Sequence, residues 1–333
     1  MFKKTIVLVV MVAVVIFMTL PAPAADKLIF KLGTVDTANS HSGVGAEAFA
    51  SEVARLSNGS MEVKVFHAGK LGNIPVQQTN VINGAQDMHL VYPEFLSQFF
   101  EEAKVISLPY LFNDLNHIQT FYTSDLWGGA MEKLEKQGAI VLDKEWTWWV
   151  KDPRGFISVR PIFTPKDLSG FKMRIWEAKA AIETWKGFGA NPIVVPRPEM
   201  YLAFSQKIIE GGPETIGVSY DQKNAEMAKY WIRTQEYYQI INIMMNKKKY
   251  DSLTPEQKDI LHQATMHAGK VFTAATQKNW ETKKRKANLE LGVSVIEPAL
   301  KPWRKAGKIT IERLAKDGFI SESFIEKING LAK

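Results

Sequence analysis

The 333-residue sequence predicts an α/β fold built from two successive blocks of strands and helices. Strand-like alternation and helical 3–4 spacing follow one another along the chain, which is the rhythm of an open α/β sheet. No run rich in Gly, Ser or Pro separates the blocks. This continuity predicts two lobes joined by crossing segments, not two independent domains on a flexible tether.

The first block contains segments of both periodicities. Strands are predicted over 28–33, 61–66 and 88–92, and helices over 45–56 and 75–83. The strand segments are short and apolar or alternate between apolar and polar residues, whereas the helical segments repeat apolar residues every three to four positions. Together they predict a first βαβ sheet.

The second block begins near Lys151 and repeats this pattern. Strands are predicted over 156–159, 171–176 and 193–195, with helices over 178–187 and 198–209. Because strands alternate with helices again, a second α/β sheet is expected.

A long helix is predicted late in the chain. Thr254-Pro-Glu-Gln257 combines a capping box with proline at the first helical position, and a helical pattern continues from 258 to 290. A helix of this length can run along both lobes and hold them together.

The N-terminus has the three-part layout of a secretory signal. Lys3 and Lys4 precede an uncharged apolar run from 5 to 20, and Ala22-Pro-Ala24 offers small residues for a signal peptidase. Residues 1–25 are therefore predicted to be a cleaved signal peptide, which places the mature protein in the periplasm. An uncleaved membrane anchor is the alternative.

Composition excludes several classes of function. The chain has no cysteine, which rules out thiol catalysis, zinc–thiolate sites and iron–sulfur clusters. Removal of Lys3 and Lys4 lowers the formal net charge from +7 to +5, too mild an excess to indicate nucleic-acid binding. Hydrolase, zinc-protease and phosphate-loop motifs are absent from the sequence, so neither enzymatic activity nor a cofactor is predicted.

Six motifs resemble, in order, those of the TRAP-transporter substrate-binding proteins, the DctP-like family. The hallmark is Thr164-Pro-Lys-Asp-Leu-Ser-Gly-Phe-Lys-Met-Arg174. The other five lie at 31–34 with 45–50, 65–72, 83–88, 107–112 and 249–257. Each motif is weakly specific, but their shared order behind a signal peptide identifies the chain as a member of this family.

The resemblance implies a two-lobed periplasmic-binding-protein (flytrap) fold, with a mixed sheet in each lobe and a long helix spanning both. Lobe I would comprise 26–150 and about 239–279, and lobe II 151–238 and about 280–333. The implied function is to trap a small organic acid in the cleft and deliver it to the membrane subunits of a TRAP permease. A periplasmic sensor that presents the acid to a membrane receptor is the alternative.

Two arginines fall on the family's carboxylate site. Arg174 matches the arginine that grips the ligand carboxylate, a role suited to the planar guanidinium fork. A surface arginine at a strand edge is the alternative. Arg154 falls where many members place a second arginine on the same acid, and a hinge-side salt bridge is its alternative.

The first lobe is expected to contribute side chains to the cleft. Tyr92, after the third strand, matches a cleft-lining position, and Phe95 has a weaker claim to the same role. Half-buried core aromatics are the alternative for both. The loop from 35 to 41 should also face the cleft, and Asp36 is a candidate there, together with Asn39 and His41.

Two positions depart from the family pattern. Glu214 replaces an asparagine that contacts the ligand in many members. It would face an amine, hydroxyl or metal on the ligand side, or else pair with a neighbouring arginine. Arg197 stands where many members have an apolar residue, and would bind a second anionic group or neutralise Glu214. Whether a metal joins the ligand stays open.

Aromatic residues point to a bulky ligand. Trp176 follows Arg174 by two residues and so shares its strand face, and further tryptophans occur within 145–149. An aromatic or bulky monocarboxylate is therefore the hypothesis for the ligand, with core filling as the alternative role of these side chains. The protein is expected to act as a monomer, with a dimer as the alternative.

Overall fold

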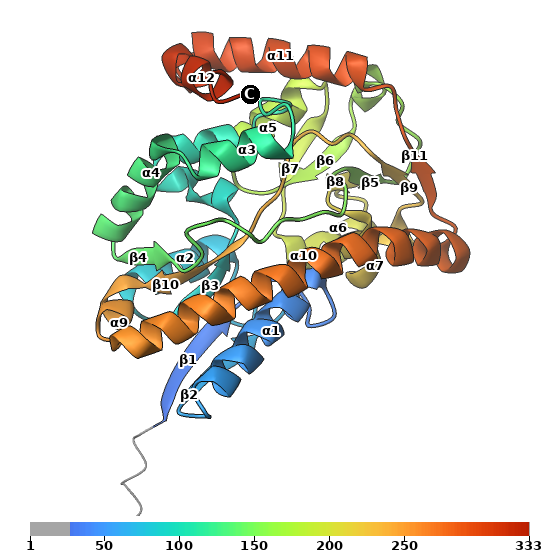
Figure 1. Cartoon of the computed structure of the whole chain (residues 1–333). Coiled ribbons are helices and arrows are strands. Elements are labelled where there is room, and N and C mark those ends of the chain that lie inside the picture. The colour runs from blue at the N-terminus through green and yellow to red at the C-terminus, as the bar shows by residue number, and fades with distance from the viewer. Residues whose placement is uncertain (1–26, 333) are drawn as a thin grey trace, which may run out of the picture.

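The computed structural model describes residues 27–332 and shows two α/β lobes, each built on a mixed sheet (Figure 1). The predicted signal peptide lies outside the described residues. The first sheet has the strand order β2-β1-β3-β10-β4, and the second has the order β11-β9-β5-β8-β6-β7. The predicted two-lobed α/β fold with mixed sheets is thereby confirmed.

Lobe I is formed mainly by the first part of the chain. Its strands are β1 (Leu28–Gly33), β2 (Met61–Phe66), β3 (Met88–Val91), β4 (Ala139–Val141) and β10 (Asn242–Asn246). Its helices are α1 (His41–Leu56), α2 (Ile74–Asn83), η1 (Pro93–Gln98), η2 (Glu101–Ser107), α3 (Leu115–Tyr122), α4 (Asp125–Lys136) and α9 (Lys247–Asp251). Strand β1 runs parallel to β2 and β3, whereas β10 is antiparallel to β3 and β4.

Lobe II carries the second sheet. Its strands are β5 (Phe156–Ser158), β6 (Lys172–Ile175), β7 (Asn191–Val194), β8 (Gly211–Pro213), β9 (Tyr230–Ile232) and β11 (Ser294–Ile296). Its helices are η3 (Pro165–Leu168), α5 (Lys179–Gly187), η4 (Arg197–Glu199), α6 (Met200–Ser205), α7 (Ile216–Asp221) and α8 (Asn224–Met227). Strand β6 is parallel to both β7 and β8, so the strands around Arg174 point the same way.

Strand β8 was not predicted from the sequence, because two glycines there favour a turn. In the structure Gly211 and Gly212 lie between β5 and β6, in the middle of the sheet. A Cβ atom on Gly211 would lie 2.6 Å from the carbonyl oxygen of Ile157, so only glycine permits this close approach. The helix predicted over 198–209 also ends early, at Ser205.

Two crossing segments and one long helix connect the lobes. The crossing segments lie side by side, since Val150 N donates to the Gln239 carbonyl at 3.0 Å and Gln235 N donates to the Arg154 carbonyl at 3.0 Å. Helix α10 (Pro255–Leu291) packs against α1 of lobe I and α7 of lobe II (Figure 1). The predicted helix spanning both lobes, with its Thr254 capping box, is confirmed.

The C-terminal helices α11 (Leu300–Lys316) and α12 (Glu322–Asn329) lie at the top of the view in Figure 1, opposite α1. Ile328 of α12 belongs to the hydrophobic cluster that contains Ile118 and Phe121 of α3. His117 Nε2 donates to the Ile328 carbonyl at 2.7 Å. The lobe boundaries stay a prediction, and α12, which that prediction assigns to lobe II, packs on a helix of lobe I.

The first crossing segment carries a buried carboxyl group, Asp152, whose titration should be visible in stability. Burial raises the pKa of Asp152 to about 7, while its Oδ2 accepts a hydrogen bond from Gly217 N at 3.1 Å. The native state therefore holds a proton that the unfolded chain releases near its ordinary pKa of 3.8. Consequently, this group's contribution to stability falls as pH rises from about 4 to about 7.

Replacement of Asp152 with asparagine is expected to raise the melting temperature at both pH values, and by much more at pH 8 than at pH 5, because the contribution of Asp152 to stability is only partly lost at pH 5. The amide keeps an acceptor for Gly217 N and removes the buried charge, a difference of up to about 4 kcal/mol at pH 8. Thermal unfolding of both proteins at the two pH values measures the effect. An equal change at pH 5 and pH 8 would contradict a proton held by Asp152.

Across residues 27–332, no helix combines the length and the apolar character required of a membrane span.

Candidate functional site

A pocket between the lobes contains most of the predicted site. It encloses about 590 Å³ of space not filled by atoms, including its opening to solvent. Lobe I supplies six lining residues, namely Val35, Asn73, Ile74, Pro75, Glu94 and Phe95. The rest are Arg154 and Tyr237 at the crossing segments and, from lobe II, Arg174, Trp176, Glu177 and the stretch 194–198. Since β6 and β7 end here, the pocket lies at the carboxyl ends of parallel strands.

Arg174 is a buried cation with no ion-pair partner among residues 27–332. It lies on β6 with 3% of its surface exposed, and its Nε donates to the Val195 carbonyl at 2.7 Å. Among the described residues, no carboxylate forms an ion pair with it. Burial, reinforced by the nearby Arg197 guanidinium, lowers the pKa of Arg174 to about 9. An anion entering the pocket would relieve this electrostatic cost.

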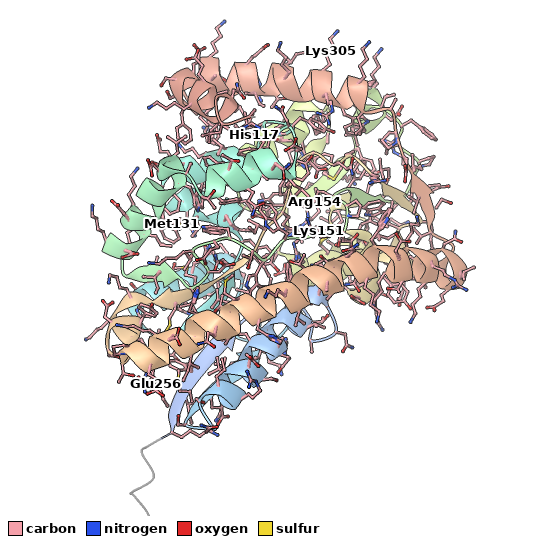
Figure 2. The ribbon with its side chains drawn as sticks, in the orientation of Figure 1. His117, Met131, Lys151, Arg154, Glu256 and Lys305 are labelled. Carbon is pink, nitrogen blue, oxygen red and sulfur yellow. The ribbon has the colours of Figure 1, made fainter. Side chains whose placement is uncertain are left out.

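Arg154 both lines the pocket and pairs with an acid. Its guanidinium lies over the rings of Tyr237 and Trp176, at 4.7 Å and 5.4 Å from their centroids. Its Nε is 3.5 Å from Glu236 Oε1. Figure 2 shows Arg154 near the centre of the molecule, next to Lys151 on the first crossing segment. Arg154 therefore has features of both predicted roles, the ligand contact and the hinge-side salt bridge.

Arg197 joins the two lobes through Asp36. Its Nη1 lies 2.9 Å from Asp36 Oδ1, and Asp36 Oδ2 accepts a hydrogen bond from the Tyr92 hydroxyl. Gln222 Nε2 of lobe II also donates to Asp36, at 3.4 Å. Burial opposes ionisation of Asp36, but Arg197 and the Tyr92 hydroxyl outweigh it and lower the pKa of Asp36. Three of the predicted site residues thus form one buried cluster across the cleft.

This cluster changes the interpretation of its members. Arg197 lines the pocket, yet the carboxylate that it contacts is Asp36 rather than Glu214. Asp36 and Tyr92, with 0% and 2% of their surface exposed, do not line the pocket and lie behind Arg197. Both residues were predicted to line the cleft from lobe I. In the structure they contact Arg197, and Arg197 lines the pocket.

Glu214 lies away from the pocket. Its Oε1 accepts from Ser219 Oγ at 2.7 Å and its Oε2 accepts from Asn224 Nδ2 at 3.1 Å, both within lobe II. Burial raises the pKa of Glu214. Glu214 does not line the pocket, and among the described residues it forms no ion pair with an arginine, although the charges of Arg197 and Arg174 act on it from a distance. Its hydrogen bonds instead tie α7 and α8 to the end of β8.

The aromatic residues divide between pocket and core. Phe95 and Trp176 line the pocket from opposite lobes, with ring centroids 6.3 Å apart. Trp146 stacks on Tyr122 with centroids 4.8 Å apart, and Trp148 Nε1 donates to the Thr265 carbonyl at 3.0 Å. Core filling, the alternative role given for the 145–149 aromatics, therefore applies to these two, which belong to the core of lobe I.

Sequence reasoning missed Glu94 and Tyr237. Glu94 lines the pocket with 3% of its surface exposed, and its Oε1 accepts from the Tyr237 hydroxyl at 3.5 Å and from Gln239 Nε2 at 3.3 Å. A glutamate usually lies at the surface, so the residue type of Glu94 did not indicate a buried position in the pocket. Its position just after β3 was the available indication, since strand ends face the cleft.

The described residues contain no group of three or more His, Asp or Glu side chains arranged to hold a metal ion.

Comparisons with known proteins agree with this geometry. The family model for bacterial extracellular solute-binding proteins, family 7 (DctP), matches residues 32–317. The 2,3-diketo-L-gulonate-binding periplasmic protein YiaO of Escherichia coli K12 is 28% identical over 247 residues, which cover 74% of each chain.

Solved structures show the same fold. A TRAP periplasmic solute-binding protein from Bordetella, with density assigned to pantoate, superposes with a TM-score of 0.82 at 24% identity, covering 92% of this chain and 100% of that one. The galactonate complex of the sugar acid binding protein DctPAm from Advenella mimigardefordensis also gives a TM-score of 0.82, at 24% identity, covering 91% and 97%. Because the family model spans most of the chain, this protein belongs to the bacterial extracellular solute-binding proteins of family 7.

Proposed function

We propose that this protein is an extracytoplasmic receptor that binds one small organic acid between its lobes and delivers it to a TRAP-type membrane permease. The observation that carries the proposal is Arg174, a buried guanidinium without a carboxylate partner among the described residues, which faces a pocket between two lobes. Buried charges are normally paired, so an unpaired one at a pocket is suited to an ionic ligand.

The relatives support this assignment. YiaO is named for binding 2,3-diketo-L-gulonate in the periplasm, and DctPAm is described as a sugar acid binding protein. The family model describes solute-binding proteins, which supports capture and release of the acid without chemical change. The predicted signal peptide over 1–25 supports a location in the periplasm.

The pocket's charges favour a single carboxylate on the ligand. Arg197 is compensated by Asp36, and Arg154 lies 3.5 Å from Glu236. Of the pocket arginines, Arg174 is thus the one without an ion-pair partner in the described part of the chain, and its guanidinium can form two parallel hydrogen bonds with a carboxylate. A second carboxylate on the ligand would have to compete with Asp36 for Arg197 or with Glu236 for Arg154.

The pocket walls favour a ligand with apolar surface. Phe95 and Ile74 line it from lobe I, and Trp176 and Val195 line it from lobe II. Because both lobes contribute, a ligand that touches both sides stabilises the closed arrangement over an open one. These walls support the hypothesis of an aromatic or bulky monocarboxylate.

The first test is a thermal-shift screen of the mature protein, unfolded and refolded beforehand to remove any acid carried from the host. The panel comprises aromatic acids, 2-hydroxy and 2-oxo acids, sugar acids and C4 dicarboxylates. A ligand present at a hundred times its Kd is expected to stabilise the native state by about 2.7 kcal/mol. Tighter binding of a C4 dicarboxylate than of every aromatic acid would overturn the monocarboxylate class. No shift with any acid would contradict the receptor function.

A further inference from the structure

Lobe I offers the ligand few polar groups. Of the six lobe I residues that line the pocket, only Asn73 and Glu94 have polar side chains. Asn73 is exposed, and its Oδ1 already caps helix α2 by accepting a hydrogen bond from Val76 N at 3.1 Å. Glu94 is therefore the buried polar group through which lobe I can recognise a ligand.

Glu94 has an unused hydrogen-bonding position. Its Oε1 receives hydrogen bonds from Tyr237 and Gln239, which fix the orientation of the carboxyl group. Its Oε2 is buried and has no partner among the described residues. A buried polar atom without a partner is uncommon in folded proteins and disfavoured energetically, so at a pocket wall it indicates a group that the ligand satisfies.

We propose that Glu94 is a specificity-determining residue whose Oε2 forms a hydrogen bond with a hydroxyl group of the ligand, while Arg174 holds the ligand's carboxylate. The ligand class is then a hydroxy monocarboxylate with an otherwise mainly apolar skeleton. This inference rests on the proposed function and deepens it. Glu94 comes from lobe I and Arg174 from lobe II, so such a ligand makes a polar contact with each lobe and couples its binding to closure.

A hydroxyl group suits this position better than an ammonium group. Burial raises the pKa of Glu94, which favours a neutral carboxylic acid that can both donate and accept a hydrogen bond. Three guanidinium groups, those of Arg154, Arg174 and Arg197, line the same pocket and would repel an ammonium ion. A hydroxyl group meets no such repulsion.

Matched acids isolate this contact. Isothermal titration of the refolded wild-type protein would compare 3-phenyllactate with 3-phenylpropionate and phenylalanine, and 2-hydroxy-4-methylpentanoate with 4-methylpentanoate and leucine. Within each trio the carboxylate and the carbon skeleton are the same, and only the group on the carbon next to the carboxylate differs: hydroxyl, hydrogen or ammonium. Loss of a hydrogen bond that leaves a buried partner unsatisfied weakens affinity by about 10- to 100-fold. The hydroxy acids are therefore expected to bind that much more tightly than their deoxy counterparts.

Variants of Glu94 test whether this residue causes the preference for hydroxy acids over deoxy acids. Glu94→Leu is expected to bind hydroxy and deoxy acids equally, whereas Glu94→Gln, which keeps a donor and an acceptor, should retain the preference for the hydroxy acid. Glu101→Leu is the matched control, because Glu101 is an exposed acid of the same lobe with 85% of its side chain accessible. Its preference should equal that of the wild type.

The outcomes separate the two proposals. Equal affinity of wild type for hydroxy and deoxy acids, with both lost in Arg174→Ala, overturns the role of Glu94 and leaves the receptor function standing. Tighter binding of the amino acids overturns the hydroxyl class. Failure of the refolded wild type to bind any carboxylate overturns the receptor function and, with it, this inference.

Discussion

Replacement of Arg174 with alanine is expected to weaken binding of the acid by a hundredfold or more while leaving the protein folded. A hydrogen bond to a charged group contributes roughly 1.5–3 kcal/mol, and the guanidinium offers two of them to a carboxylate. The fold should tolerate the change, because among the described residues the side chain makes a single hydrogen bond, to the Val195 carbonyl, and no carboxylate lies within ion-pair distance of it. Titration calorimetry measures the affinity, and thermal unfolding without ligand reports the fold.

Arg174→Lys sharpens this test. An ammonium keeps the positive charge but lacks the planar fork, so affinity should still fall substantially. Arg160→Ala is the control, since Arg160 stacks on Phe171 and does not line the pocket. Wild-type affinity in Arg174→Ala would show that the carboxylate is bound elsewhere.

Replacement of Asp36 with asparagine is expected to give the second largest effect, on the closed arrangement of the lobes. The change leaves the Arg197 guanidinium, which has 12% of its side chain accessible, without its carboxylate. Removal of one partner from a buried ion pair typically costs about 3–5 kcal/mol. The two residues belong to different lobes, so opening of the cleft would let water solvate Arg197. Opening would recover part of this free-energy cost, and the variant should therefore favour an open arrangement.

Small-angle scattering would measure the opening of the lobes, and chemical unfolding would measure the loss of stability. The ligand-free variant should show a larger radius of gyration than the wild type, together with lower stability. Glu62→Gln is the control, because the exposed Lys27–Glu62 pair lies within lobe I and surface pairs contribute only about 0–1 kcal/mol. An unchanged radius of gyration and unchanged stability would mean that the Asp36–Arg197 contact does not hold the lobes together.

Local patterns in the sequence were sufficient to predict those elements whose formation depends on residues a few positions apart. The apolar alternation over 61–66 became β2, and the capping box at Thr254 began α10 one residue later. Such features depend on residues a few positions apart, whose propensities act before tertiary contacts form. The same holds for the family motif around Arg174, which lies on a strand whose end faces the cleft.

Contacts between distant parts of the chain were decided only by the tertiary structure. Arg197 contacts Asp36, 161 positions away, because the lobes bring the ends of β1 and β7 together. Glu214, which matches a ligand-binding position in the family, accepts hydrogen bonds from Ser219 and Asn224, which the sequence did not predict.

The sequence by itself therefore determined the α/β class, the long connecting helix and the arginine on β6. The tertiary structure decided which charges are already neutralised and which remain for a ligand. The physical reason is that a charge is compensated by whatever lies within a few ångströms, and that neighbourhood is assembled from segments far apart in the chain. Glu94 illustrates this: its residue type indicates a surface position, but burial beside Tyr237 and Gln239 makes it a wall of the pocket.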